Sequence, residues 1–242
     1  MRAAFAVTCL VFVFAPMSAI AQDMSSILSE GGSISTRGIQ IFLLITVLSL
    51  APGLAIMVTC FPFIVTVLSI LRQALGLQQS PPNMLIVSLA MFLTYFVMEP
   101  VFSTAWEQGV SPMIEEAITP TEAFPLVMQP FRTFMASRLD PETFQAMADL
   151  RPNSLEIQLG PDAPLSVLMP SFMLSEISRA FQIGFLVFLA FLIIDLVVAA
   201  VLMSMGMMMV PPAIVSLPFK LSFFVVADGW SLIATSLVRG YG

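Results

Sequence analysis

The first half of the chain begins with a long apolar run that predicts helices inside a membrane. Gly38–Leu71 spans 34 residues without a formal charge, which is too long for one crossing of about 20 residues and suits two closely joined helices. Pro52-Gly53 lies in the middle of this run, so we expect a break between helices over Ile39–Leu50 and Leu54–Leu71. The pattern therefore predicts a kinked helix or a helical hairpin.

Three further apolar stretches follow. The apolar stretch Met84–Met98 is closed by Glu99-Pro100, and we expect an amphipathic helix to continue to about Gln108. Leu165–Met209 runs until Pro211-Pro212 stops it. A last segment covers Phe219–Val238. We expect an all-α membrane protein with about four hydrophobic segments, arranged as broken helical hairpins.

The segment between these stretches, residues 99–164, has a different composition. It holds ten of the fifteen acidic residues of the chain. Thr119-Pro120-Thr121-Glu122 and Asp140-Pro141-Glu142 each combine a capping residue, a first-turn proline and an early acid, which is typical of a helix start. We predict a small helical insertion exposed to solvent.

Residues 1–21 have the three parts of a secretory signal peptide. Arg2 precedes an apolar stretch, Ala3–Ala15, and Ala19-Ile20-Ala21 supplies small residues at a cleavage site. The alternative is a first transmembrane helix that the mature chain retains. We expect cleavage, followed by an N-terminal hairpin region (residues 22–98), the acidic segment (residues 99–164) and a C-terminal hairpin region (residues 165–242).

Basic residues suggest an orientation for these helices. Arg72 follows the first apolar block and Lys220 follows the third, and Lys and Arg are enriched in cytoplasmic loops. The acidic middle segment then lies on the periplasmic side, together with both ends of the mature chain.

Composition narrows the function classes. Of the 242 residues, 58% are apolar and only 10% charged, and the mean hydropathy is +0.98, whereas a soluble domain has about 25% charged residues. A net charge of −6 gives no basic surface for nucleic acid. The chain has no histidine, so chemistry based on that side chain is excluded. We expect neither an enzyme nor a metal or cofactor site.

Asp195 is the first candidate functional residue, because an aspartate in the middle of an apolar helix is costly unless it is paired or functional. Lys220, which lies beyond the Pro-Pro turn, is its predicted partner. A structural ion pair is favoured over a proton relay or a pore lining, although a buried pair can also fix how helices align.

Met207, Met208 and Met209 form the second candidate site, just before the Pro-Pro turn. Methionine is flexible and polarizable, so such residues can seal a pore as a hydrophobic constriction. From the residues alone, ordinary core packing is the favoured interpretation.

Two stretches resemble signatures of the FliP family of flagellar type III export-gate proteins: Pro170–Phe185 and Pro218–Trp230. Phe191–Pro212 and the turn Arg72–Asn83 also match, so the resemblance covers nearly all of residues 38–240. It implies a subunit of a helical export gate in the basal body at the inner membrane. In that gate a pentamer joins FliQ and FliR, docks with FlhA and FlhB, and passes unfolded flagellar proteins.

The resemblance also implies roles for particular residues. Met207–Met209 become a gasket that closes the channel, in place of core packing, and the pair of Asp195 and Lys220 serves assembly or gating. The remaining signature positions, expected to serve assembly, are Glu176, Arg179, Phe181, Gly184, Pro218, Phe219, Asp228, Gly229 and Trp230. The alternatives are the counterpart in a virulence injectisome and a proton channel or secondary transporter that uses Asp195.

Overall fold

The computed structural model describes residues 34–77, 80–152, 157–207 and 209–241. The chain divides into two compact units, residues 1–53 and 54–242. All regular secondary structure in the described ranges is helical, which confirms the predicted fold class. The predicted signal peptide lies outside these residues, and the predicted division at residues 98 and 164 remains a prediction.

Within the first unit the described residues belong to α2 (Ile34–Met57), which runs on into the second unit. Gly38–Met57 is long and apolar enough to cross a membrane. The helix continues through Pro52-Gly53, so the break predicted there is wrong. A proline inside a helix removes one backbone hydrogen bond, and membrane helices tolerate this loss. The break falls instead before α3, where Pro62 occupies the first turn and needs no donor.

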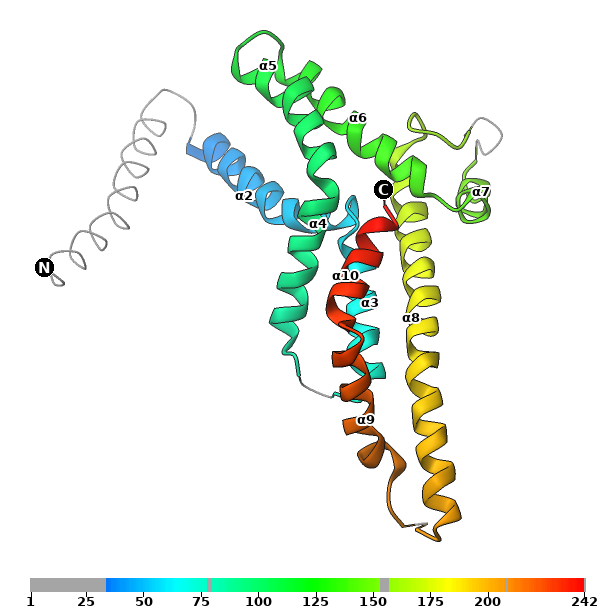
Figure 1. The fold of residues 1–242 in the computed structure, drawn as a ribbon. Helices are drawn as coiled ribbons and strands as arrows, with labels where there is room; N and C mark the ends of the chain where they lie inside the picture. The colour runs from blue at the N-terminus through cyan, green and yellow to red at the C-terminus, as the bar shows by residue number, and fades with distance from the viewer. Residues whose placement is uncertain (1–33, 78–79, 153–156, 208, 242) are drawn as a thin grey trace, which may run out of the picture. The chain divides into compact units, whose positions relative to one another are not determined.

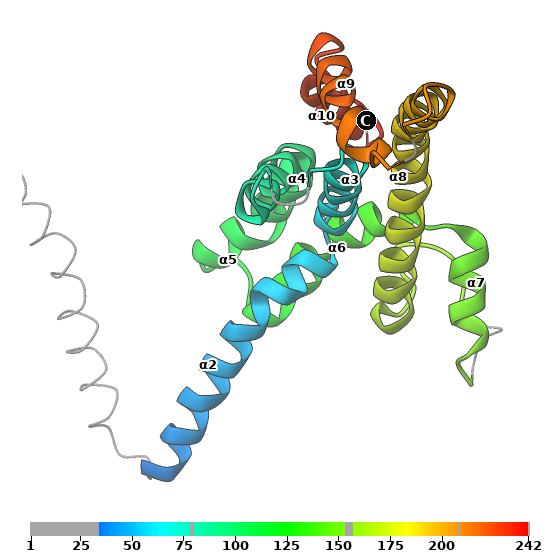
Figure 2. The same ribbon diagram turned by 90° about the horizontal axis from the view of Figure 1, so that it is seen from below.

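The centre of the second unit is α3 (Phe61–Ala74), which packs against both α4 (Asn83–Ala105) and α8 (Leu165–Ser204). Figure 2 shows α3 between these two helices. Its buried side chains include Phe63 and Leu68. The α3–α8 contact is close, because a Cβ on Gly184 of α8 would lie 2.4 Å from Cδ1 of Ile70.

The helix α4 runs past Glu99-Pro100, and the continuation predicted to about Gln108 is confirmed. It continues through Pro100 to Ala105, then passes into a π-helix (Trp106–Val110) and α5 (Ser111–Ile114). The helix α6 (Pro120–Arg138) packs against both α4 and the π-helix. Packing of this kind keeps a helix continuous although a proline removes one of its backbone hydrogen bonds.

Both predicted helix starts in the acidic segment are confirmed. The helix α6 (Pro120–Arg138) begins after Thr119, whose backbone N–H donates to the Glu122 carboxylate at 2.9 Å. The helix α7 (Pro141–Asp149) begins after Asp140, which accepts from the Thr143 N–H at 2.9 Å. These hydrogen bonds favour the charged carboxylates and lower their pKa values, chiefly through the Thr119 N–H for Glu122 and the Thr143 hydroxyl for Asp140.

The end of α8 differs from the prediction, because the helix stops at Ser204 and not at the Pro-Pro pair. Gly206 adopts a left-handed backbone (φ +73°), its N–H donates to the carbonyl of Met203, and the N–H of Met207 donates to that of Leu202. This pair of bonds is a Schellman motif, which needs glycine at the left-handed position. Pro212 is instead the first residue of α9 (Pro212–Val226).

The predicted last segment, Phe219–Val238, falls on two helices. The helix α9 is followed by α10 (Gly229–Arg239), and their axes meet at 62°. Asp228 turns the chain with a left-handed backbone (φ +47°). The Phe224 ring lies directly against Gly229, where an added Cβ would be 2.2 Å from Cε2.

Three helical stretches are long and apolar enough to cross a membrane: Gly38–Met57, Asn83–Ile114 and Leu165–Ser204. The bent pair of α9 and α10 makes a fourth if it counts as one span. The prediction of about four hydrophobic segments is confirmed for the described residues. Figure 1 shows α8 as the longest helix, with α3 and the α9–α10 pair beside it.

Candidate functional site

One cluster of charged residues surrounds Glu176 of α8, whose side chain is completely buried. The Arg138 Nε lies 3.1 Å from its Oε1, and the Arg179 Nη1 lies 3.8 Å from the same oxygen. The Tyr241 hydroxyl donates to Oε2. Both carboxylate oxygens therefore have partners, as a buried charge requires.

Arg138 links this cluster to distant parts of the chain. Its Nη1 donates to the carbonyl of Gly240 at 2.7 Å, and its guanidinium carbon lies 4.1 Å from the centre of the Tyr241 ring. The cluster thus joins α6, α8 and the turn after α10. Sequence reasoning named Glu176 and Arg179 but missed Arg138 and Tyr241. The only feature of the sequence that could have pointed to Arg138 is that it is one of few bases in an acidic segment, which is a weak signal. The residues next to Tyr241 give no indication of its role.

A second cluster surrounds Asp195, further along α8. The Lys220 Nζ lies 2.6 Å from Asp195 Oδ2 and also donates to the carbonyl of Ala74 at 3.1 Å. The Ser216 hydroxyl donates to Asp195 Oδ1 at 2.5 Å. This cluster joins α3, α8 and α9. The sequence predicted the two charged residues as partners and missed Ser216, because a serine in a helix carries no signal of such a contact.

The methionine turn, residues 205–210, connects α8 to α9, and its described methionines are exposed. Met209 is 97% exposed and Met207 is 43% exposed. Met208 lies outside the described residues. Met207 and Met209 are therefore not part of the described apolar core.

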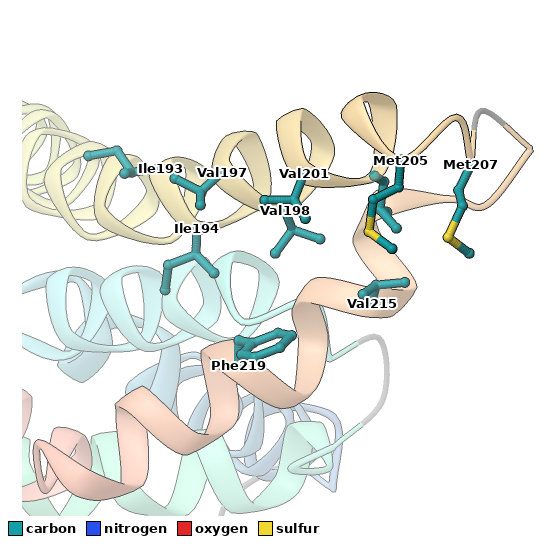
Figure 3. A pocket seen from close by; sticks show the side chains of 10 residues that line it. Ile193, Ile194, Val197, Val198, Val201, Met205, Met207, Val215 and Phe219 are labelled. Atoms are coloured by element: carbon teal, nitrogen blue, oxygen red, sulfur yellow. The ribbon is translucent and has the colours of Figure 1, made fainter.

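An apolar groove of about 580 Å³ lies between α8 and α9, next to the methionine turn. Figure 3 shows aliphatic side chains of α8 facing Val215 and Phe219 of α9, with Met205 and Met207 at one end. The lining residues are Ile193, Ile194, Val197, Val198, Val201, Leu202, Met205, Met207, Val215 and Phe219. Every one of these side chains is apolar, so the groove can make apolar contacts but its lining side chains supply no hydrogen-bonding group.

The remaining predicted signature residues do not meet at one site. Phe181 of α8 and Phe219 of α9 are both 59% exposed. Pro218 lies inside α9. The Trp230 ring packs edge-on against Phe224 at the α9–α10 bend, with 5.4 Å between the ring centres.

The polar contacts of these two clusters join helices to one another. Among the described residues no group of three or more Cys, Asp or Glu side chains is arranged to hold a metal ion. Two of the ion pairs, Arg138–Glu176 and Lys220–Asp195, link helices that are far apart in the sequence, whereas Arg179 and Glu176 lie three residues apart in α8. The fold and the two clusters thus define an all-helical membrane protein with ion pairs between its helices.

Comparison with known proteins assigns the family. Residues 44–237 match the model of the FliP family. A protein of Caulobacter vibrioides named flagellar biosynthetic protein FliP is 48% identical, over 93% of this chain and 85% of its own length. Proteins of the same name from Agrobacterium fabrum and Bacillus subtilis are each 45% identical. These alignments cover 98% and 84% of this chain, and 98% and 91% of the relatives.

The chain therefore belongs to the FliP family, whose members are membrane components of flagellar type III export. The predicted resemblance and its general function are confirmed. The partners, the subunit number, the orientation in the membrane and the roles of single residues are matters for proposal.

Proposed function

We propose that the chain is a core subunit of the flagellar type III export gate, and that several copies line a channel for flagellar proteins across the inner membrane. Its family membership carries this proposal. By the same argument the partners are FliQ and FliR within a pentamer-based gate, with FlhA and FlhB docked to it and unfolded flagellar proteins as the cargo.

The observation that supports a gate at the methionine turn is its exposure. Met205, Met207 and Met209 are all exposed although they are apolar, and a group of exposed apolar side chains at the tip of a helical hairpin indicates a partner surface. Copies arranged in a ring would bring these tips together at the channel axis.

Methionine suits such a seal for a physical reason. Its unbranched side chain fills irregular gaps and adapts to many shapes, so a ring of methionines can exclude ions at rest. The same ring can then yield to polypeptides of different sequence. Hydrophobic constrictions are known to gate channels by excluding water.

The test replaces Met207, Met208 and Met209 together with alanine and measures ion leakage and secretion of flagellar proteins. We expect leakage to rise while part of the secretion is kept. Met91→Ala is the matched control, because Met91 is also exposed but lies on α4. An unchanged seal in the triple variant would contradict the gate.

We further propose that the Asp195–Lys220 pair serves assembly or gating. Exchanging the two residues (Asp195→Lys with Lys220→Asp) should partly rescue secretion that either single change abolishes. No rescue would show that their pairing is not what secretion needs. Both oxygens of Asp195 already accept hydrogen bonds, which supports a structural role over a proton relay.

A further inference from the structure

Pro218 interrupts the hydrogen-bond ladder of α9 near its centre. Proline has no N–H, so the carbonyl of Ile214 loses its usual partner four residues ahead, and helices commonly bend at such a position. In α9 the proline separates an N-terminal half, Pro212–Leu217, from a C-terminal half, Phe219–Val226.

The two hydrogen-bond partners of Asp195 lie on opposite sides of this proline. Ser216, two residues before it, donates to Oδ1 at 2.5 Å, and Lys220, two residues after it, binds Oδ2 at 2.6 Å. Positions four apart share one face of a helix. A single carboxylate of α8 thus holds both halves of α9 at the point where the backbone ladder is weakest.

The two halves differ in how else they are held. In the C-terminal half, Phe224 is buried against Phe191 of α8, with 6.3 Å between ring centres, and against Gly229. Within the described residues, the N-terminal half has no such ring contact with α8: it faces α8 across the apolar groove, whose α9 wall consists of Val215 and of Phe219, the residue after the proline (Figure 3). The methionine turn is attached directly to this less constrained half.

We propose that Asp195 holds the two halves of α9 in line across the Pro218 break by binding Ser216 and Lys220 together, an arrangement called the splint below. Ser216 is the positioning residue that fixes the N-terminal half and the methionine turn. Release of the splint lets Pro212–Leu217 pivot at Pro218 over the groove, while the C-terminal half stays on α8. The part of this inference that concerns gating rests on the proposed function, and the splint itself does not.

The size of the motion follows from the length of the lever. Six residues of helix span about 9 Å, and a bend of about 20° at the proline moves the far end by about 3 Å. A shift of this size at each copy is enough to part side chains that touch at a ring.

The splint is tested by measuring a distance between spin labels in the solubilised assembly, with labelled copies diluted among unlabelled ones. Labels are placed at Ile214→Cys on α9 and Leu186→Cys on α8, which are 71% and 66% exposed, in a background without Cys9 and Cys60. Ser216→Ala should broaden the distance distribution and shift it by about 3 Å. The control Ser222→Ala removes an exposed serine of the same helix and should leave the distribution narrow.

The decisive comparison combines Ser216→Ala with Pro218→Ala. Restoring the backbone ladder removes the need for the splint, so the double variant should give the narrow distribution of Pro218→Ala alone. Independent, additive effects of the two changes would overturn the proposal, as would an unchanged distance in Ser216→Ala.

Ion leakage, measured on the same variants without labels, separates the splint from the gate. We expect leakage to rise in Ser216→Ala and to return to the wild-type level in the double variant. A shifted distance with no leakage would confirm the splint and reject the methionine turn as the seal. Leakage with an unshifted distance would reject the splint.

Discussion

At the scale of single residues, Glu176 depends on its partners, because its carboxylate has no exposed surface. Its two arginines differ in what they contribute. The Arg138 side chain is 15% exposed and close to the carboxylate, whereas the Arg179 side chain is 38% exposed and lies further away. The free-energy cost of removing each should follow this difference.

We expect Arg138→Leu to lower the free energy of unfolding by about 3–5 kcal/mol, because it leaves a buried charge without its main partner. Arg179→Leu is the matched control and should cost about 0–1 kcal/mol, as for an exposed pair. Denaturation of the purified protein in detergent measures both. Equal effects would mean that Arg138 is not the main partner of Glu176.

Gly184 gives a second test of close packing. Gly184→Ala places a methyl group against Ile70 and should destabilise by about 1–3 kcal/mol. Ile70→Val removes the nearest atom, so the double variant should be more stable than the sum of the single effects predicts. Gly160→Ala, where an added Cβ meets nothing within 4 Å, is the control, and thermal unfolding is the measurement. If the effects of the two substitutions on stability simply add, the clash between them is not the cause of the destabilisation.

The sequence marks some residues of the two clusters and not others, for a physical reason. Asp195 can be found because a charge in an apolar run must be compensated, and Lys220 is the first base beyond the Pro-Pro turn. Ser216 and Tyr241 cannot be found this way, because serine and tyrosine are ordinary in helices and near helix ends. Their contacts arise only when α8 and α9, or α8 and the turn after α10, pack together.

At the scale of helices, the prolines show what local sequence can predict. Pro120 and Pro141 follow capping residues and begin helices as predicted, because capping depends only on neighbouring residues. Pro52, Pro100 and Pro218 lie inside helices. Whether a proline breaks a helix depends on the packing around it, which the sequence pattern does not contain.

The two capped helices should respond to acid. The pKa values of Glu122 and Asp140 are lowered in the folded state from ordinary values of 4.5 and 3.8. Their stabilisation is complete above the ordinary values and is lost as pH falls through the lowered ones. We expect amide-exchange protection in residues 120–149 to decline as pH falls below about 4.

Asp140→Asn should remove the part of this acid response that belongs to α7, whereas Glu142→Gln, at an exposed acid in the same helix, should leave it in place. Amide exchange followed by mass spectrometry resolves the two helices separately. Protection that does not change with pH in the unmodified chain would exclude the caps as its cause.

At the scale of the whole molecule, orientation in the membrane is a prediction that labelling can test. Leu150 follows α7 and Ser80 lies in the turn before α4, and both are exposed. The distribution of basic residues places Leu150 on the periplasmic side and Ser80 on the cytoplasmic side.

A maleimide that does not cross the inner membrane should therefore label Leu150→Cys in intact cells and Ser80→Cys only after lysis, in a background without Cys60. Reversed labelling would contradict the orientation. Labelling of both in intact cells would contradict a membrane crossing between them.

The length of α8 has a consequence for the fate of each copy in the cell. Its 40 residues extend about 60 Å, about twice the thickness of the hydrocarbon layer. Lipid can cover only about half of this apolar helix, and exposing the other half to water is unfavourable. We expect quality-control proteases to remove copies that find no protein neighbours, so that the amount of the chain in a cell reports how many assemblies are complete.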